Sequence, residues 1–279
     1  MVTKYTNVKL FSNNEVEFLD EVIVSGGEII SVNDNYTGVI DEKIIEPVYL
    51  LPKLNSLDIS NLDKYNVFDL NNLTALSLST QLKGFDKNKQ TIMYLKDPIL
   101  LNVEYDVIVP FCKKNNIKVV ANVGRTLDEM GWCDKMYGMT PVDFLEECGV
   151  LDLEPIILSG ANLEKSDIEK LAYYNATICL DVTIDWKNGN GIAQIATILK
   201  NNLNVIMNGK NIVKEMLNLR LLAQGYFKIQ NIVSREDLIN IATTNYEKVF
   251  NLDTMQNKNK WLNYAIYANV DDIEELING

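Results

Sequence analysis

The chain has 279 residues, of which 47% are apolar and 23% charged, and its formal net charge is −12. The apolar content excludes an intrinsically disordered chain, and the acidic balance disfavours nucleic acid as a partner, because a phosphate backbone is bound through Lys and Arg. The sequence contains no histidine. That absence removes the usual general base of hydrolases, the Ser-His-Asp arrangement and most zinc sites.

Cysteine spacing and hydropathy indicate a protein of a reduced, aqueous compartment. The four cysteines, at positions 112, 133, 148 and 179, form no C-x-x-C pair and no metal-binding spacing. The apolar runs, such as residues 47–51, are far shorter than the roughly 20 residues that a membrane span needs. We therefore expect a cytoplasmic protein with free buried thiols and no membrane partner.

The first fifty residues have the pattern of short strands. Residues 22–24 and 28–32 flank the turn Ser25-Gly26-Gly27, which predicts a hairpin. Residues 44–51 form another β-favouring stretch, closed by Pro52. The N-terminal segment therefore reads as antiparallel β structure.

From about residue 90 the pattern changes to alternating strands and helices. The expected strands are residues 117–121, 156–158, 177–182 and 204–207. The expected helices are residues 98–114, 141–148, 164–174, 192–199, 213–223 and 234–243. Such alternation predicts a parallel sheet, either doubly wound or closed into a barrel. Residues 61–90 carry no clear pattern, and residues 261–268 return to strand character.

Short sequence motifs recur along the chain in a definite order. They include GGEIISV at 26–32, LPKLNSLDIS at 51–60, YGMTPVDFLEECGVL at 137–151 and KNGNGIA at 187–193. In this order they resemble the amidohydrolase superfamily, specifically its branch of cytosine-deaminase-like and chlorohydrolase-like metal-dependent hydrolases.

The resemblance implies an α/β fold with two parts. Residues 51–254 would form a TIM-like (β/α) barrel, and residues 1–50 plus 255–279 would form a small composite β-sandwich. The stretch between the first barrel strand and the strand at 117–121 is short for this branch. We therefore expect an incomplete barrel, with fewer than the eight strands of a full one.

Every catalytic position of the family that can be aligned carries a different residue here. The replacements are Asp58 and Ser60 for the first two metal-binding histidines, Asn122 for the third, Arg125 for the acid/base glutamate, Ser159 for the fourth metal-binding histidine, Asn162 for the nearby substrate histidine, and Lys210 for the metal-and-base aspartate. Ser and Asn are poor ligands for zinc or iron, and a lysine ammonium repels a cation. These seven residues are therefore expected to line a pocket that holds no metal and no cofactor.

Several sharper interpretations of single residues stay open. Asp58 could belong to an all-oxygen cation site, although we favour a carboxylate that is solvated or paired with Lys210 or Arg125. Asp181 and Asp185 could form a catalytic pair, although aspartate is common at strand ends and in loops. A buried Lys210 could form a Schiff base. The loop at 187–193 could cradle a phosphate, but it lacks the residues of a P-loop or dinucleotide site.

The favoured hypothesis is an amidohydrolase-like protein that has lost the His/Asp metal centre. It would be inactive as a metallohydrolase and act as a binding or regulatory protein for a small-molecule ligand, as a homodimer or with an intact paralogue. The alternative is an enzyme or hydrolase with a replaced active site, acting on carbon–nitrogen bonds of a cyclic amidine or nucleobase-like substrate. A third hypothesis is a hydrolase with an all-oxygen metal site.

Overall fold

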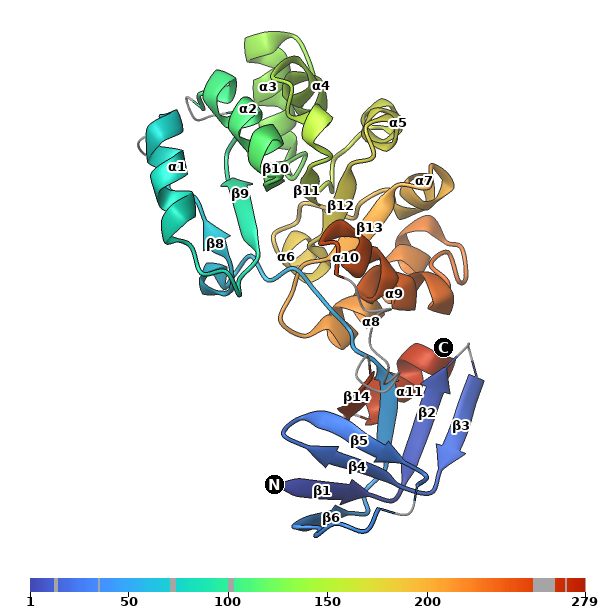
Figure 1. The fold of residues 1–279 in the computed structure, drawn as a ribbon. Coiled ribbons are helices and arrows are strands. Elements are labelled where there is room, and N and C mark those ends of the chain that lie inside the picture. Colours follow the sequence, from blue (N-terminus) through green and yellow to red (C-terminus); the bar gives the residue numbers. More distant parts are fainter. Residues whose placement is uncertain are drawn as a thin grey trace. The chain divides into compact units, whose positions relative to one another are not determined.

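The computed structural model describes residues 1–12, 15–34, 36–70, 74–99, 103–252, 264–268 and 270–278. The chain divides into two compact units, one of Met1–Asn55 with Ser234–Gly279 and one of Ser56–Val233 (Figure 1). No helix in the described ranges is both long and apolar enough to cross a membrane.

The first unit contains two four-stranded sheets. One has the order β5-β4-β1-β6 and the other β14-β7-β2-β3. The strands are β1 (Val2–Tyr5), β2 (Val8–Ser12), β3 (Glu15–Leu19), β4 (Val22–Ser25), β5 (Glu28–Val32), β6 (Glu42–Ile44), β7 (Val48–Pro52) and β14 (Tyr264–Tyr267). Buried apolar side chains from both sheets form one cluster, made of Val8, Leu10, Val22, Ile29, Val48 and Leu50. The unit therefore contains a small β-sandwich with its core between the sheets.

Two predicted strand features of this unit are confirmed. β4 and β5 pair antiparallel, and Gly26 and Gly27 between them both have positive φ, +58° and +84°. A two-residue hairpin turn of this kind favours glycine, which meets no steric penalty there. β14 pairs antiparallel with β7, so a C-terminal strand completes a sheet whose other strands come from the start of the chain.

The last described element of the chain is a helix. Residues Val270–Asn278 form helix α11. Ile273 and Leu276, three residues apart, are both fully buried, which is the spacing of a helix face. Lys9 and Tyr49 anchor this helix, because both donate hydrogen bonds to Glu274 Oε1, over 2.6 and 3.1 Å. Helices α9 (Arg235–Ala242) and α10 (Thr244–Val249) also belong to this unit.

The second unit is built on a parallel sheet of six strands. Its order is β13-β12-β11-β10-β9-β8, formed by β8 (Asn66–Val67), β9 (Thr91–Leu95), β10 (Lys118–Val123), β11 (Ile156–Ser159), β12 (Thr177–Leu180) and β13 (Asn204–Met207). Every neighbouring pair in it is parallel. Leu57 adds an isolated parallel bridge to Asn208. The described part of the chain thus has fewer than eight regular barrel strands and an unclosed sheet, which confirms the expected incomplete barrel.

Helices connect and accompany these strands. They are α1 (Ala75–Gly84), α2 (Tyr105–Asn115), α3 (Leu127–Tyr137), α4 (Pro141–Glu147), α5 (Lys165–Tyr173), α6 (Val182–Lys187), α7 (Ile195–Lys200) and α8 (Ile212–Phe227), with 3₁₀ turns η1 (Leu62–Lys64) and η2 (Leu151–Leu153). α4 begins as predicted, with Thr140 and Asp143 forming a reciprocal capping box. α2 begins at Tyr105 rather than near residue 98, and the Tyr105 hydroxyl donates to the Pro98 carbonyl over 2.6 Å.

Candidate functional site

Polar side chains gather where the strands of the parallel sheet end. Because the strands are parallel, their carboxyl ends lie at the same edge of the sheet, where barrel enzymes place their functional residues. Asn122 lies near the end of β10, Ser159 ends β11, and Asp181 and Asn208 directly follow β12 and β13.

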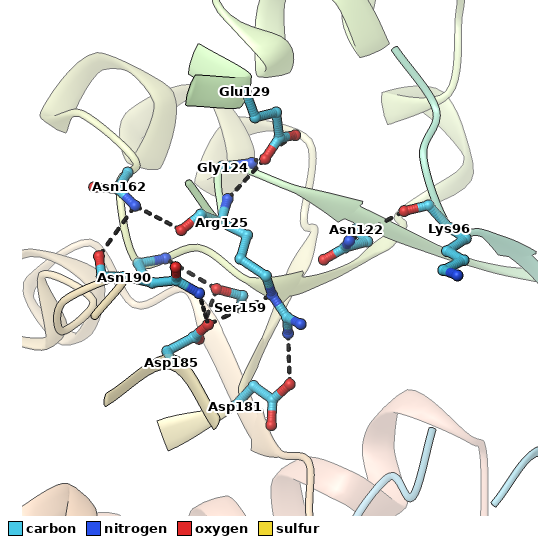
Figure 2. A network of polar contacts seen from close by, with 11 residues as sticks. Lys96, Asn122, Gly124, Arg125, Glu129, Ser159, Asn162, Asp181, Asp185 and Asn190 are labelled. Atoms are coloured by element: carbon cyan, nitrogen blue, oxygen red, sulfur yellow. Dashed lines mark hydrogen bonds and ion pairs between the residues drawn. The ribbon is translucent and has the colours of Figure 1, made fainter. Parts of the chain in front are cut away.

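Arg125 joins two of these strand ends through ion pairs. Its Nη2 bonds to Asp181 Oδ2, and its Nε lies 3.4 Å from Asp185 Oδ1. Figure 2 shows the guanidinium extending from the end of β10 toward both aspartates. The two carboxylate side chains are 4% and 6% exposed, and the arginine side chain 20%. The positive charge is therefore fixed between two carboxylates that are almost fully removed from water.

Asp185 has two further partners. Ser159 Oγ donates to its Oδ2 over 2.7 Å, and Asn190 Nδ2 donates to its Oδ1 over 2.9 Å. Burial raises the pKa of the Asp185 carboxyl, and these hydrogen bonds together with the Arg125 charge oppose part of that rise. We call Arg125, Ser159, Asp181, Asp185 and Asn190 the arginine cluster.

Side-chain hydrogen bonds stabilise the backbone around the arginine cluster, which includes one unusual conformation. Ser159 has φ +80°, in the left-handed region that non-glycine residues rarely occupy. Its Oγ accepts a hydrogen bond from Ala161 N over 3.3 Å. Asn162 Nδ2 donates to the carbonyls of Arg125 and Asn190, over 2.6 and 3.2 Å (Figure 2). The loops after β10 and β11 are thus tied to each other and to the loop after α6.

Glu129 holds the start of α3 against the end of β10. Its two carboxylate oxygens accept from the backbone N–H groups of Gly124 and Arg125, over 3.2 and 3.0 Å. Burial raises the pKa of Glu129, although these backbone bonds and the Arg125 charge act in the opposite direction. Glu129 therefore fixes the backbone from which the Arg125 side chain extends.

Asp58 lies in a second group of polar side chains. Ser60 Oγ donates to Asp58 Oδ1 over 2.6 Å, and Lys64 Nζ lies 2.8 Å from Oδ2. Burial acts to raise the pKa of Asp58, but the bonds from Lys64 and Ser60 and the charge of Lys210 outweigh it, so the pKa is lowered. We call Asp58, Ser60 and Lys64 the lysine cluster.

The prediction that Asp58 pairs with Lys210 or Arg125 is therefore wrong, because the ion-pair partner of Asp58 is Lys64. Turn η1 brings Lys64 back to Asp58, whereas Arg125 is paired with Asp181. Lys210 is exposed and acts on Asp58 through its charge.

Asn122 has its own partner outside both clusters. Its Nδ2 donates to the Lys96 carbonyl over 3.0 Å, and its buried Oδ1 has no hydrogen-bond partner among the described residues. The seven predicted positions thus separate: Arg125, Ser159 and Asn162 share one network, Asp58 and Ser60 another, and Asn122 and Lys210 belong to neither. The sequence interpretation gave Asp181 and Asp185 only a minor role and omitted Asn190, Glu129 and Lys64. The place of Asp181 directly after a buried strand marks it as a strand-end residue, but not as the partner of Arg125.

A cavity of about 330 Å³ opens beside Arg125. Three carboxylates, one guanidinium, one indole and several smaller side chains line it: Asp97, Pro98, Ile99, Asn122, Arg125, Thr126, Asp128, Glu129 and Trp132.

Comparison with known proteins relates the chain to deaminases. No family model matches it. A 5-methylthioadenosine/S-adenosylhomocysteine deaminase of Pyrococcus abyssi is 32% identical over 145 residues, 49% of this chain and 34% of that protein. A 5'-deoxyadenosine deaminase of Methanocaldococcus jannaschii is 24% identical over 168 residues, 57% of this chain and 40% of that protein. The matches therefore span well under half of these relatives' length.

Solved structures share the fold at low sequence identity. A guanine deaminase from C. acetobutylicum with bound guanine has a TM-score of 0.70 at 11% identity, covering 100% of this chain and 96% of that one. An adenosine deaminase from Xanthomonas campestris with bound zinc has a TM-score of 0.65 at 12% identity, covering 90% and 80%.

The parallel sheet, with its polar residues at the carboxyl ends of the strands, has the arrangement of (β/α)-barrel enzymes, and these deaminase structures share its fold. The motifs resemble the amidohydrolase superfamily, and the sequence relatives, which are deaminases, agree with that resemblance, while the solved structures share the fold.

The residues at the strand ends do not fit a zinc ion. The sequence offers no imidazole, and Asn122 and Ser159 supply weak neutral donors. The carboxylates are already matched with cations of the chain, Asp58 with Lys64 and Asp181 with Arg125. Within the described ranges, no three acidic or thiol side chains are placed to share a metal ion.

Proposed function

We propose that this chain is an amidohydrolase-like protein without a hydrolytic metal centre, which acts by binding a small molecule rather than by hydrolysing it. The observation that supports this most is the position of Arg125. Its guanidinium is paired with Asp181 and lies 3.4 Å from Asp185. A dication placed there would meet a fixed positive charge at short range, and the repulsion is strong in a buried site.

Neither Asp58 nor Asp185 is suited to activate water. Asp58 has a lowered pKa, so it is a weak base, and it is bonded to an ammonium. Asp185 has a raised pKa, but both of its oxygens accept hydrogen bonds from the chain. General base catalysis needs a base with a pKa near the working pH and in reach of the proton that it takes up.

The proposal is tested by elemental analysis of protein purified without chelator, together with an ammonia-release assay. The substrates follow from the relatives' names: 5'-methylthioadenosine, S-adenosylhomocysteine, 5'-deoxyadenosine and guanine. We expect far less than one zinc or iron per chain and no ammonia above the rate without protein. About one metal ion per chain, with turnover abolished by Asp58→Ala, would support the all-oxygen metal hydrolase instead.

A second candidate function rests on Asp185. Burial raises its pKa, and Ser159 Oγ lies 2.7 Å from it. This pair favours the alternative of a metal-free enzyme that acts on a carbon–nitrogen bond of a cyclic amidine or nucleobase-like substrate. That enzyme would release ammonia in the presence of chelator and lose this activity in Asp185→Asn.

The proposal extends to the association of this protein with other chains. We propose that it works as a homodimer or with an intact paralogue that retains the metal centre. Light scattering on the full chain, alone and mixed with such a paralogue, measures both forms of association.

A further inference from the structure

The cavity beside Arg125 has walls of two kinds. Pro98, Ile99 and Trp132 give it apolar and aromatic surface, while Asp97, Asp128 and Glu129 give it carboxylates. Its volume of about 330 Å³ falls in the range of small-molecule sites. The turn after β9, the end of β10, the loop that follows β10 and the first two turns of α3 form it.

The cavity carries an excess of negative charge. None of the described ion pairs contains Asp97, Asp128 or Glu129. Arg125 is the one cation among the lining residues, and its charge already faces Asp181 and Asp185 outside the cavity. A ligand with a phosphate or carboxylate would therefore be repelled, and a cation would be attracted.

Two further features of the wall suit a nitrogen cation. The indole of Trp132 can stabilise a positive charge over its face. The Asn122 Oδ1 is a buried acceptor without a partner among the described residues, and such an atom is unfavourable until a donor reaches it. A ligand N–H group that reached this oxygen would satisfy it. A metal cation has no apolar body that could pack against Pro98, Ile99 and Trp132.

We infer that this cavity binds an organic cation, namely a protonated amine or amidine with an apolar body. The inference rests on the proposed function, because it assigns a ligand class to a protein that binds rather than hydrolyses. The ammonium or amidinium group lies among Asp97, Asp128 and Glu129, and the apolar body packs against Pro98, Ile99 and Trp132.

The test compares benzamidine with benzamide, which have nearly the same shape but differ in charge at pH 7. Isothermal titration with the full chain measures their affinities at low salt and again at 0.5 M NaCl. We expect saturable binding of benzamidine at least tenfold tighter than that of benzamide, a difference of about 1.4 kcal/mol. The affinity for benzamidine should fall at high salt, because its charge is partly screened.

Matched variants locate the site on α3. Asp128→Asn removes an exposed carboxylate of the cavity, and Trp132→Leu removes the indole. Asp134→Asn removes an exposed carboxylate of the same helix that does not line the cavity. We expect the first two changes to weaken benzamidine binding roughly three- to tenfold and the third to leave it unchanged.

The inference is overturned by equal affinities for the two compounds, by no saturable binding of benzamidine, or by equal losses in Asp128→Asn and Asp134→Asn. These outcomes differ from a failure of the proposed function. Ammonia release from the nucleoside panel would refute the proposed function, whatever the preference between benzamidine and benzamide.

Discussion

The lysine cluster and the arginine cluster both contain buried carboxylates, but they join very different lengths of chain. Asp58 and Lys64 are 6 residues apart, and the Lys64 side chain is 55% exposed. Arg125 and Asp181 are 56 residues apart, and the Arg125 side chain is 20% exposed. Water and salt screen the first pair, while the second connects the ends of β10 and β12. The arginine cluster should therefore stabilise the second unit far more than the lysine cluster does.

The largest effect is expected from Arg125→Met. This variant leaves Asp181 and Asp185 buried without their cation, and breaking a buried pair in this way costs about 3–5 kcal/mol. Urea denaturation measures the loss. Lys64→Met is the matched control, with an expected loss below about 1 kcal/mol because its ammonium is half exposed. Equal losses in the two variants would remove the distinction between the clusters.

A smaller difference in stability is expected between two substitutions of Ser159. Ser159→Ala loses the hydroxyl bond to Asp185 but keeps a Cβ in the left-handed backbone region. Ser159→Gly loses the same bond and also relieves the backbone strain, which is about 1–2 kcal/mol for a non-glycine residue. We expect the glycine variant to be the more stable by about 1 kcal/mol in the same denaturation assay. A less stable glycine variant would show that the backbone at this position carries no such strain.

The smallest effect is a difference in pH dependence. The folded pKa of Asp58 is lowered, so its contribution is present above the unfolded value of about 3.9 and is lost as the pH falls through the folded pKa. Asp58→Asn should therefore cost about 1 kcal/mol at pH 7 and less at pH 3.

The contribution of Asp185 to stability should change with pH in the opposite direction. Its folded pKa is raised, so its contribution is fully present below the unfolded value and is lost as the pH rises through the folded pKa. Asp185→Asn should accordingly be less harmful at pH 7 than at pH 3. Parallel pH profiles for the two variants would contradict the assigned pKa directions.

The central strands were predictable from sequence because they are short apolar runs between turn signals. β10 to β13 lie where the pattern predicted strands, and their side chains are almost all buried. The N-caps Thr140 and Ser234 were predictable as well, since each bonds to a residue three positions later. β8 was not predictable, because two residues cannot establish an alternating pattern.

The candidate site was predictable only as a set of positions. The motifs marked Arg125 and Ser159 as replacements of catalytic residues, and both lie at the expected strand ends. Their partners could not be read from the sequence, because Asp181 and Asp185 meet Arg125 only after β10 and β12 lie in the same sheet. Lys64 was missed for another reason: turn η1 lies in the stretch without a recognisable pattern.

The guanidinium of Arg125 also changes how the fold depends on its surroundings. A dissociable ion stabilises a protein by mass action, so its effect fades when the free ion is scarce. Arg125 belongs to the same chain as Asp181 and Asp185. One guanidinium is therefore present for each pair of aspartates at any protein or salt concentration. The arginine cluster forms at the moment its strands assemble, without waiting for a second molecule to arrive. The positive charge that faces Asp181 and Asp185 is therefore present wherever the chain is folded.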